Sequence, residues 1–169
     1  MNKVVLANAL RFLGLLLLQV LILDEIELHG FVNPYIYPLF ILLLPLEIPH
    51  WLLMVIGFVF GLIIDIYANT LGFHASATVW LAFVRPYLLS FNQPRGGYEP
   101  EHRPVMSIMG FRWTILYVSI AILLHHLILF FVEVSSFSDF PSTFIKIFLS
   151  TGISIMMVML YQFVFVPRN

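Results

Sequence analysis

The stretch from Gly57 to Ala75, "GFVFGLIIDIYANTLGFHA", places one ionisable residue, Asp65, inside a run that is otherwise almost wholly apolar. The composition of the chain indicates whether water or lipid surrounds this run. Of 169 residues, 61% are hydrophobic and only 10% are charged, whereas an ordinary soluble domain carries roughly 25% charged residues. The sequence therefore predicts an all-α integral membrane protein with a single domain over residues 1–169.

Composition and motifs also exclude several classes of site. The chain has no cysteine, which rules out disulfides and thiolate metal sites. Its formal net charge of −1 gives no sign of a nucleic-acid partner. The sequence contains no phosphate-binding glycine loop and no nucleophile with a matching base and orienting group. We therefore expect neither an enzyme nor a bound cofactor or metal.

Six apolar segments are expected to cross the membrane as one helical bundle, because a helix needs about 20 mostly apolar residues to cross ~30 Å of hydrocarbon. No small-residue cleavage site follows the first segment, so we expect it to be a permanent helix. The second segment is short and rich in proline, which leaves it either a short kinked span or a re-entrant loop. The expected spans are residues 4–23, 34–47, 50–67, 71–91, 112–133 and 142–166.

The positions of the basic residues decide between these two possibilities. Lys3 lies before the first span, and Arg95 and Arg103 lie in the polar loop 92–111. If both groups face the cytoplasm, an even number of crossings separates them, and segment 34–47 must span. The sequence therefore predicts that both termini and loop 92–111 are cytoplasmic.

Two further cations lie inside expected spans. Lys146 is one turn into the last span, and its side chain is expected to snorkel to the outer surface. The side chain of Arg85 leans away from the cytoplasm, and Pro86 follows it. We expect Arg85 to bond a carbonyl or another helix, or to mark the helix end.

Gly57, Gly61 and Asp65 recur every four residues and therefore share one face of the third span. Gly-x3-Gly lets a second helix backbone approach closely. This second helix belongs either to the same bundle or to a partner protein, and the spacing alone is compatible with both.

Asp65 lies near the C-terminal end of its span, where the helix dipole disfavours a carboxylate. The next span begins within a few residues and offers unpaired N-terminal amides, with Asn69 or Thr70 as caps and Gly72 as a flexible point. We expect Asp65 to accept hydrogen bonds there and to tie a tight outer corner between two helices. The alternatives are a proton or ion site and contact with a partner.

Other polar residues of the spans are interpreted as structural. His125 and His126 are adjacent and point about 100° apart on a helix, so we expect hydrogen bonds to neighbouring helices rather than a metal site. Ser150, Gly152 and Ser154 are expected to form a narrow packing seam on the last span.

The region from Asn33 to Ala77 resembles the MreD family of bacterial rod-shape-determining membrane proteins. The shared pattern is a proline that opens a short second helix, then Gly-x3-Gly-x3-Asp, then Leu-Gly at the start of the fourth helix. In this chain the matching residues are Pro34, Gly57, Gly61, Asp65, Leu71 and Gly72. The resemblance makes these residues candidates for partner binding or helix packing.

The resemblance implies a non-enzymatic part of the cell-elongation machinery in the bacterial inner membrane. Such proteins bind MreC, a single-span partner, beside MreB and the RodA–transpeptidase pair that makes lateral peptidoglycan. Members are also similar to the six-helix substrate-binding subunits of energy-coupling-factor transporters, so a vitamin-binding subunit is the alternative. Those subunits typically dock through Ala-x3-Ala on the first helix, but Arg11 follows Ala7 at that spacing and Leu13 follows Ala9. A channel or proton-coupled carrier based on Asp65 is a third hypothesis.

Overall fold

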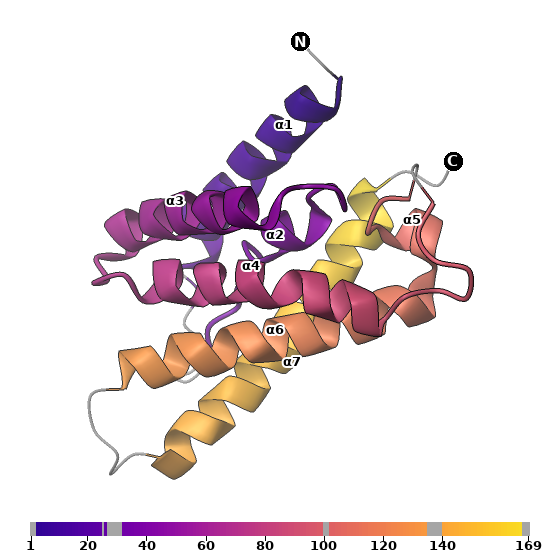
Figure 1. The fold of residues 1–169 in the computed structure, drawn as a ribbon. Coiled ribbons are helices and arrows are strands. Elements are labelled where there is room, and N and C mark those ends of the chain that lie inside the picture. Colours follow the sequence, from indigo (N-terminus) through magenta and orange to yellow (C-terminus); the bar gives the residue numbers. More distant parts are fainter. Residues whose placement is uncertain (1–2, 25, 27–31, 100–101, 135–139, 167–169) are drawn as a thin grey trace.

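The computed structural model describes residues 3–24, 26, 32–99, 102–134 and 140–166, and the regular elements within them are helices. Figure 1 shows these helices packed along one another, with α1 projecting from the rest at its N-terminal end. The elements are α1 (Lys3–Leu18), the π-helix η1 (Gln19–Leu23), α2 (Leu39–Leu43), α3 (His50–Ala68), α4 (Phe73–Phe91), α5 (Met106–Met109), α6 (Phe111–Glu133) and α7 (Phe140–Phe165).

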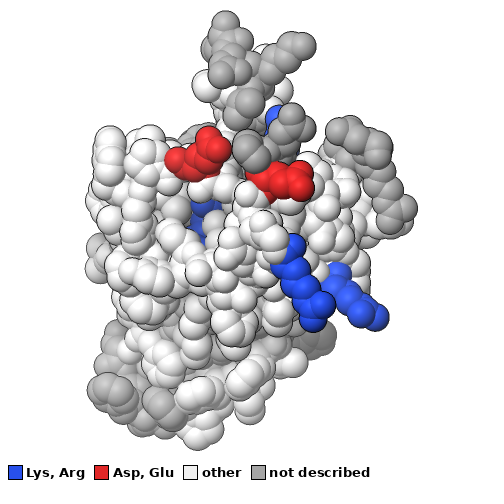
Figure 2. All heavy atoms as spheres, turned by 45° about the vertical axis from the view of Figure 1, so that its right-hand side comes forward, with Lys and Arg blue, Asp and Glu red and all other residues white. Residues whose placement is uncertain are grey.

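Four helices are long and apolar enough to cross a membrane, judged by length and composition. They cover Val5–Leu23, His50–Ala68, Phe111–Glu133 and Pro141–Phe165. Figure 2 shows the matching surface, which is mostly uncharged on the face in view, with acidic and basic side chains at only a few places. The chain is therefore a multi-pass membrane protein.

Helix α4 has the same 19-residue length as α3 but is less apolar, and it is not among those four. It carries His74, Arg85 and Pro86, and the two ionisable side chains are buried inside the protein. The two helices lie side by side as an antiparallel hairpin (Figure 1). Because α3 covers one side of α4, that side needs no contact with lipid.

The hairpin defines two ends of the molecule. We call the end with the α3–α4 turn, residues 69–72, the corner end, and the end with residues 92–99 and 102–105 the loop end. Figure 1 shows the N-terminal end of α1, helix α5 and the C-terminal end of α7 toward the loop end.

The prediction of a helix over residues 34–47 is wrong in extent, because this segment is helical only over Leu39–Leu43. Pro34 lies in irregular chain, and Pro38, not Pro34, precedes the helix as its N-cap. Leu44 adopts an extended conformation directly before Pro45, with φ −60° and ψ 150°. The cause is local: proline disfavours the α-helical conformation of the residue before it and donates no backbone hydrogen bond.

This short segment lies in the core of the bundle. Every residue from Pro34 to Leu44 is buried, and α2 contacts α1, α3 and α4. Its surroundings are therefore protein rather than lipid, which is the condition under which irregular backbone is tolerated at membrane depth.

Candidate functional site

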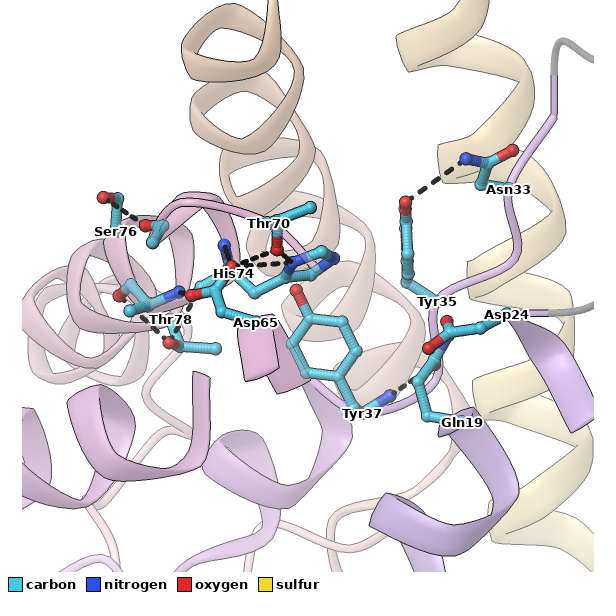
Figure 3. Close-up of polar contacts among 12 residues, drawn as sticks. Gln19, Asp24, Asn33, Tyr35, Tyr37, Asp65, Thr70, His74, Ser76 and Thr78 are labelled. Atoms are coloured by element: carbon cyan, nitrogen blue, oxygen red, sulfur yellow. Dashed lines mark hydrogen bonds and ion pairs between the residues drawn. The ribbon is translucent and has the colours of Figure 1, made fainter. Parts of the chain in front are cut away.

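Asp65 ties the corner between α3 and α4 through both of its carboxylate oxygens. The side chain is only 2% exposed. Oδ1 accepts from the backbone N–H of His74 at 3.0 Å, and Oδ2 accepts from the N–H of Ala75 at 2.8 Å (Figure 3). Both amides belong to the first turn of α4, where no helical carbonyl can accept them. Asp65 therefore caps α4 from the preceding helix, as its place in the sequence predicts.

Two side chains complete the hydrogen bonds of Asp65 Oδ1. The Thr70 hydroxyl donates to it at 2.5 Å, and His74 Nδ1 lies 3.1 Å away. An ionised carboxylate only accepts, so His74 carries its proton on Nδ1. The turn itself depends on left-handed backbone at Asn69, with φ 54°, and at Gly72, with φ 88°. Both carboxylate oxygens of Asp65 thus have hydrogen-bond donors within the corner.

The glycine face of α3 packs against α4 of the same chain. A Cβ atom added to Gly61 would lie 2.2 Å from Thr78 Oγ1 and 2.5 Å from Ala75 Cα, and one added to Gly57 would lie 2.9 Å from the Thr78 carbonyl oxygen. The Thr78 hydroxyl is within 2.8 Å of the Gly57 carbonyl oxygen, to which it can donate. Of the two possibilities left by the spacing, this geometry selects packing within the bundle, because α4 already occupies the face.

Leu71 differs from the other residues of the motif. It is 94% exposed at the tip of the α3–α4 turn, so it packs against nothing within the described chain. Its exposure leaves this side chain to lipid, to the membrane surface or to a partner.

Buried polar side chains make hydrogen bonds to the backbone N–H and C=O groups of the irregular segment between α1 and α2. Gln19 Oε1 accepts from the N–H groups of Ile36 at 2.9 Å and Tyr37 at 3.4 Å, and Gln19 Nε2 donates to the Pro34 carbonyl at 3.2 Å (Figure 3). We did not single out Gln19 from the sequence. The available signal was a lone glutamine in an apolar span, which needs a buried partner.

The serines of α7 serve the same segment. Ser150 Oγ accepts from the N–H of Asn33 at 3.2 Å, and Ser154 Oγ accepts from the N–H of Tyr35 at 2.9 Å. Gly152 does not belong to this seam: it is exposed, and no atom lies within 4 Å of a Cβ added there. The predicted seam of three small residues is therefore a pair of hydrogen-bond acceptors.

His125 and His126 point to different neighbours, as their adjacent positions predict. His125 Nε2 lies 2.9 Å from the Tyr37 hydroxyl, and His126 Nδ1 lies 3.1 Å from the Thr151 hydroxyl. Among the described residues, no group of three His, Cys, Asp or Glu side chains could hold a metal ion. The histidines thus link α6 to the buried segment and to α7.

Lys146 pairs with an acid at the corner end. Its Nζ lies 3.0 Å from Glu133 Oε1 and 4.8 Å from the centre of the Phe130 ring. The cation therefore reaches the end of the bundle, as snorkelling predicts, and it is held there by a carboxylate and an aromatic face.

A cavity of about 250 Å³ opens beside the Asp65 corner. Polar groups line it from four parts of the chain, including Asp24, Asn33, His74 and Glu133. His74 thus joins the corner to this cavity, with Nδ1 committed to Asp65 and Thr70.

Arg85 bonds neutral groups from two other parts of the chain. Nε donates to the Tyr117 hydroxyl on α6 at 3.2 Å, and Nη2 donates to the carbonyl of Leu44 and, at 3.4 Å, to that of Pro45. The expectation that Arg85 bonds a carbonyl or another helix is confirmed in both parts.

Comparison with protein-family models, curated proteins and solved structures finds no match for this chain.

Proposed function

We propose that this chain is a non-enzymatic, MreD-like component of the bacterial cell-elongation machinery, placed in the inner membrane and binding a single-span MreC-type partner. The observation that carries the proposal is the α3–α4 hairpin. Gly57, Gly61 and Asp65 have the spacing on which the MreD resemblance rests, and all three serve one closely packed, hydrogen-bonded corner. A rigid bundle of this kind suits a scaffold that helps to control cell shape and lateral peptidoglycan synthesis beside MreB and the RodA–transpeptidase pair.

The proposal includes six crossings, with both termini and loop 92–111 in the cytoplasm. The course of the buried segment supports this number. Asn33 lines the cavity at the corner end together with His74, whereas Leu46 lines a cavity at the loop end together with Arg85. Extended chain advances ~3.3 Å per residue and helix 1.5 Å, so residues 33–46 are long enough to pass ~30 Å of hydrocarbon. Segment 34–47 then acts as a mostly non-helical crossing shielded by its neighbours.

The test combines cell shape with partner capture. Depletion of this chain in its host should turn rods into rounded cells, and re-expression should restore rods and co-purify the MreC-type protein. Gly61→Leu should abolish both, because the added side chain meets the backbone of α4. Gly152→Leu is the matched control, since Gly152 faces open space. Normal rods after depletion, or no capture by wild-type protein present at normal membrane levels, would refute the proposal.

The cavity at the corner end favours a second candidate, the vitamin-binding subunit of an energy-coupling-factor transporter. Its volume of about 250 Å³ and its polar lining suit part of a small polar ligand. The first helix argues against this function, because Arg11 and Leu13 replace the second alanine of the docking motif. Co-purification with an energy-coupling module, together with vitamin binding by the purified chain, would select this candidate instead.

A further inference from the structure

The guanidinium of Arg85 has more hydrogen-bond donors than the described chain provides acceptors for. The side chain is 1% exposed, and its hydrogen bonds to Tyr117, Leu44 and Pro45 use Nε and Nη2 only. Within the described chain, Nη1 has no hydrogen bond, and no carboxylate lies within 4.0 Å of the guanidinium. A positive charge is thus buried with neutral acceptors alone.

This condition is costly for an arginine. The guanidinium stays charged in proteins, so it cannot escape burial by losing its proton. Carbonyl dipoles offset only part of the loss of hydration, and buried charges are normally paired. The two N–H groups on Nη1, which the described chain leaves unused, are free to donate to an anion.

A cavity of about 360 Å³ at the loop end is lined in part by Arg85, and its volume is within the size range of ligand sites. Among the described residues that line it, Arg85 is the only Lys, Arg, Asp or Glu. Tyr98 adds no negative charge, because burial raises the pKa of its phenol, and its hydroxyl donates to the Leu89 carbonyl at 2.8 Å. The remaining lining has four apolar and three polar residues. It comprises Leu46, Ile48, Pro86 and Leu89, with His50, Ser90 and Gln93.

The position of the cavity indicates the kind of anion. It lies where α3 begins and α4 ends, and the exposed aromatic side chains there are Trp51, Tyr87 and Phe91. Exposed Trp and Tyr at helix ends are typical of the boundary between hydrocarbon and headgroups. The apolar lining fits the glycerol and upper acyl region of a lipid, and arginine pairs with phosphate oxygens in a fork geometry.

We propose that this cavity binds the phosphate of an anionic phospholipid, with Arg85 as the group that holds it. The site lies at the loop end, away from the Asp65 corner, and does not depend on the proposed cell-elongation function.

The experiment measures lipid retention by the purified full-length chain. Native mass spectrometry compares bound phosphatidylglycerol with bound phosphatidylcholine, whose choline cation opposes the charge of Arg85. Wild-type protein should prefer phosphatidylglycerol by about tenfold, because the choline cation of phosphatidylcholine competes with Arg85 for the phosphate. Arg85→Gln should lose this preference. Arg95→Gln removes the same charge from an exposed position and should keep it.

Arg85→Gln also breaks the bonds to Leu44 and Pro45, so a second variant leaves Arg85 intact. Gln93→Glu adds a carboxylate to the cavity lining and should lower phosphatidylglycerol retention by about tenfold without lowering the thermal unfolding temperature. Inorganic phosphate at the concentration of the lipid should not displace it. Equal retention of both lipids by wild-type protein, or full retention by Gln93→Glu, would overturn the site. Displacement by inorganic phosphate would overturn the lipid as its ligand.

Discussion

At the residue scale, Asp65 is an acceptor whose two oxygens serve different amides, and this geometry ranks its substitutions. Asp65→Leu leaves the N–H groups of His74 and Ala75 unpaired in a buried corner, which we expect to lower the free energy of unfolding by at least ~2 kcal/mol. Asp65→Asn keeps one oxygen but turns an NH2 group toward one of these amides, so we expect a smaller loss of ~1 kcal/mol. Unfolding of the purified variants in detergent measures both.

Thr70→Val is the control for Asp65. It removes one donor to Oδ1 but leaves both amide bonds, so its effect should be smaller than that of Asp65→Leu. The proton-carrier hypothesis makes the opposite prediction for function. An Asp65→Asn protein that folds with wild-type stability but fails to restore cell shape would show that Asp65 acts by titration and not by capping.

At the element scale, the distance between α3 and α4 is set by glycine. A methyl group at Gly61 would lie within 2.6 Å of Thr78 Oγ1, Ala75 Cα and the His74 carbonyl oxygen, so we expect Gly61→Ala to cost ~1–3 kcal/mol through overpacking. Gly152→Ala should be neutral or slightly stabilising, since that glycine is helical and meets no atom within 4 Å. Thermal unfolding of both variants in the same detergent makes the comparison. Equal stability of the two would contradict the close packing of the hairpin.

The buried segment before α2 depends on Gln19 of η1 in the same way. Gln19→Leu keeps a side chain of similar size but removes the hydrogen-bond partners of the Ile36 and Tyr37 amides and the Pro34 carbonyl. We expect a loss of at least ~2 kcal/mol in the free energy of unfolding. Hydrogen exchange should speed up at the Ile36 and Tyr37 amides. Gln93→Leu, at an exposed position, is the control, and unchanged exchange in Gln19→Leu would show that these amides have other partners.

At the scale of the whole molecule, the two ends of the bundle are predicted to face opposite sides of the membrane. The chain has no cysteine, so single cysteines report location without background. Leu71→Cys, at the exposed corner, should react with a membrane-impermeant maleimide on intact cells, and Arg95→Cys should react only after permeabilisation. Reaction of both residues from the same side would refute a membrane-spanning α3–α4 hairpin.

The sequence alone determined that the chain lies in a membrane, that it is helical, and where most of its long helices run, since these follow from local properties. A run of about 20 apolar residues identifies a span wherever its neighbours lie, and α3, α6 and α7 begin and end within two residues of their predicted bounds. The role of Asp65 was also predictable, because the amides that it caps lie 9 and 10 residues along the chain.

Only the tertiary structure decided which residues satisfy the irregular backbone of segment 34–47. Its hydrogen-bond partners come from distant elements. Ser150 and Ser154 lie 117 and 119 residues from the residues whose backbone N–H groups donate to them. Arg85 lies 41 residues from Leu44, whose carbonyl accepts from it. Prolines stop the helix locally, but they do not specify which side chains replace its hydrogen bonds. The free donors of Arg85 became visible in the same way, because the hydrogen bonds and charges around a buried group depend on how separate helices pack.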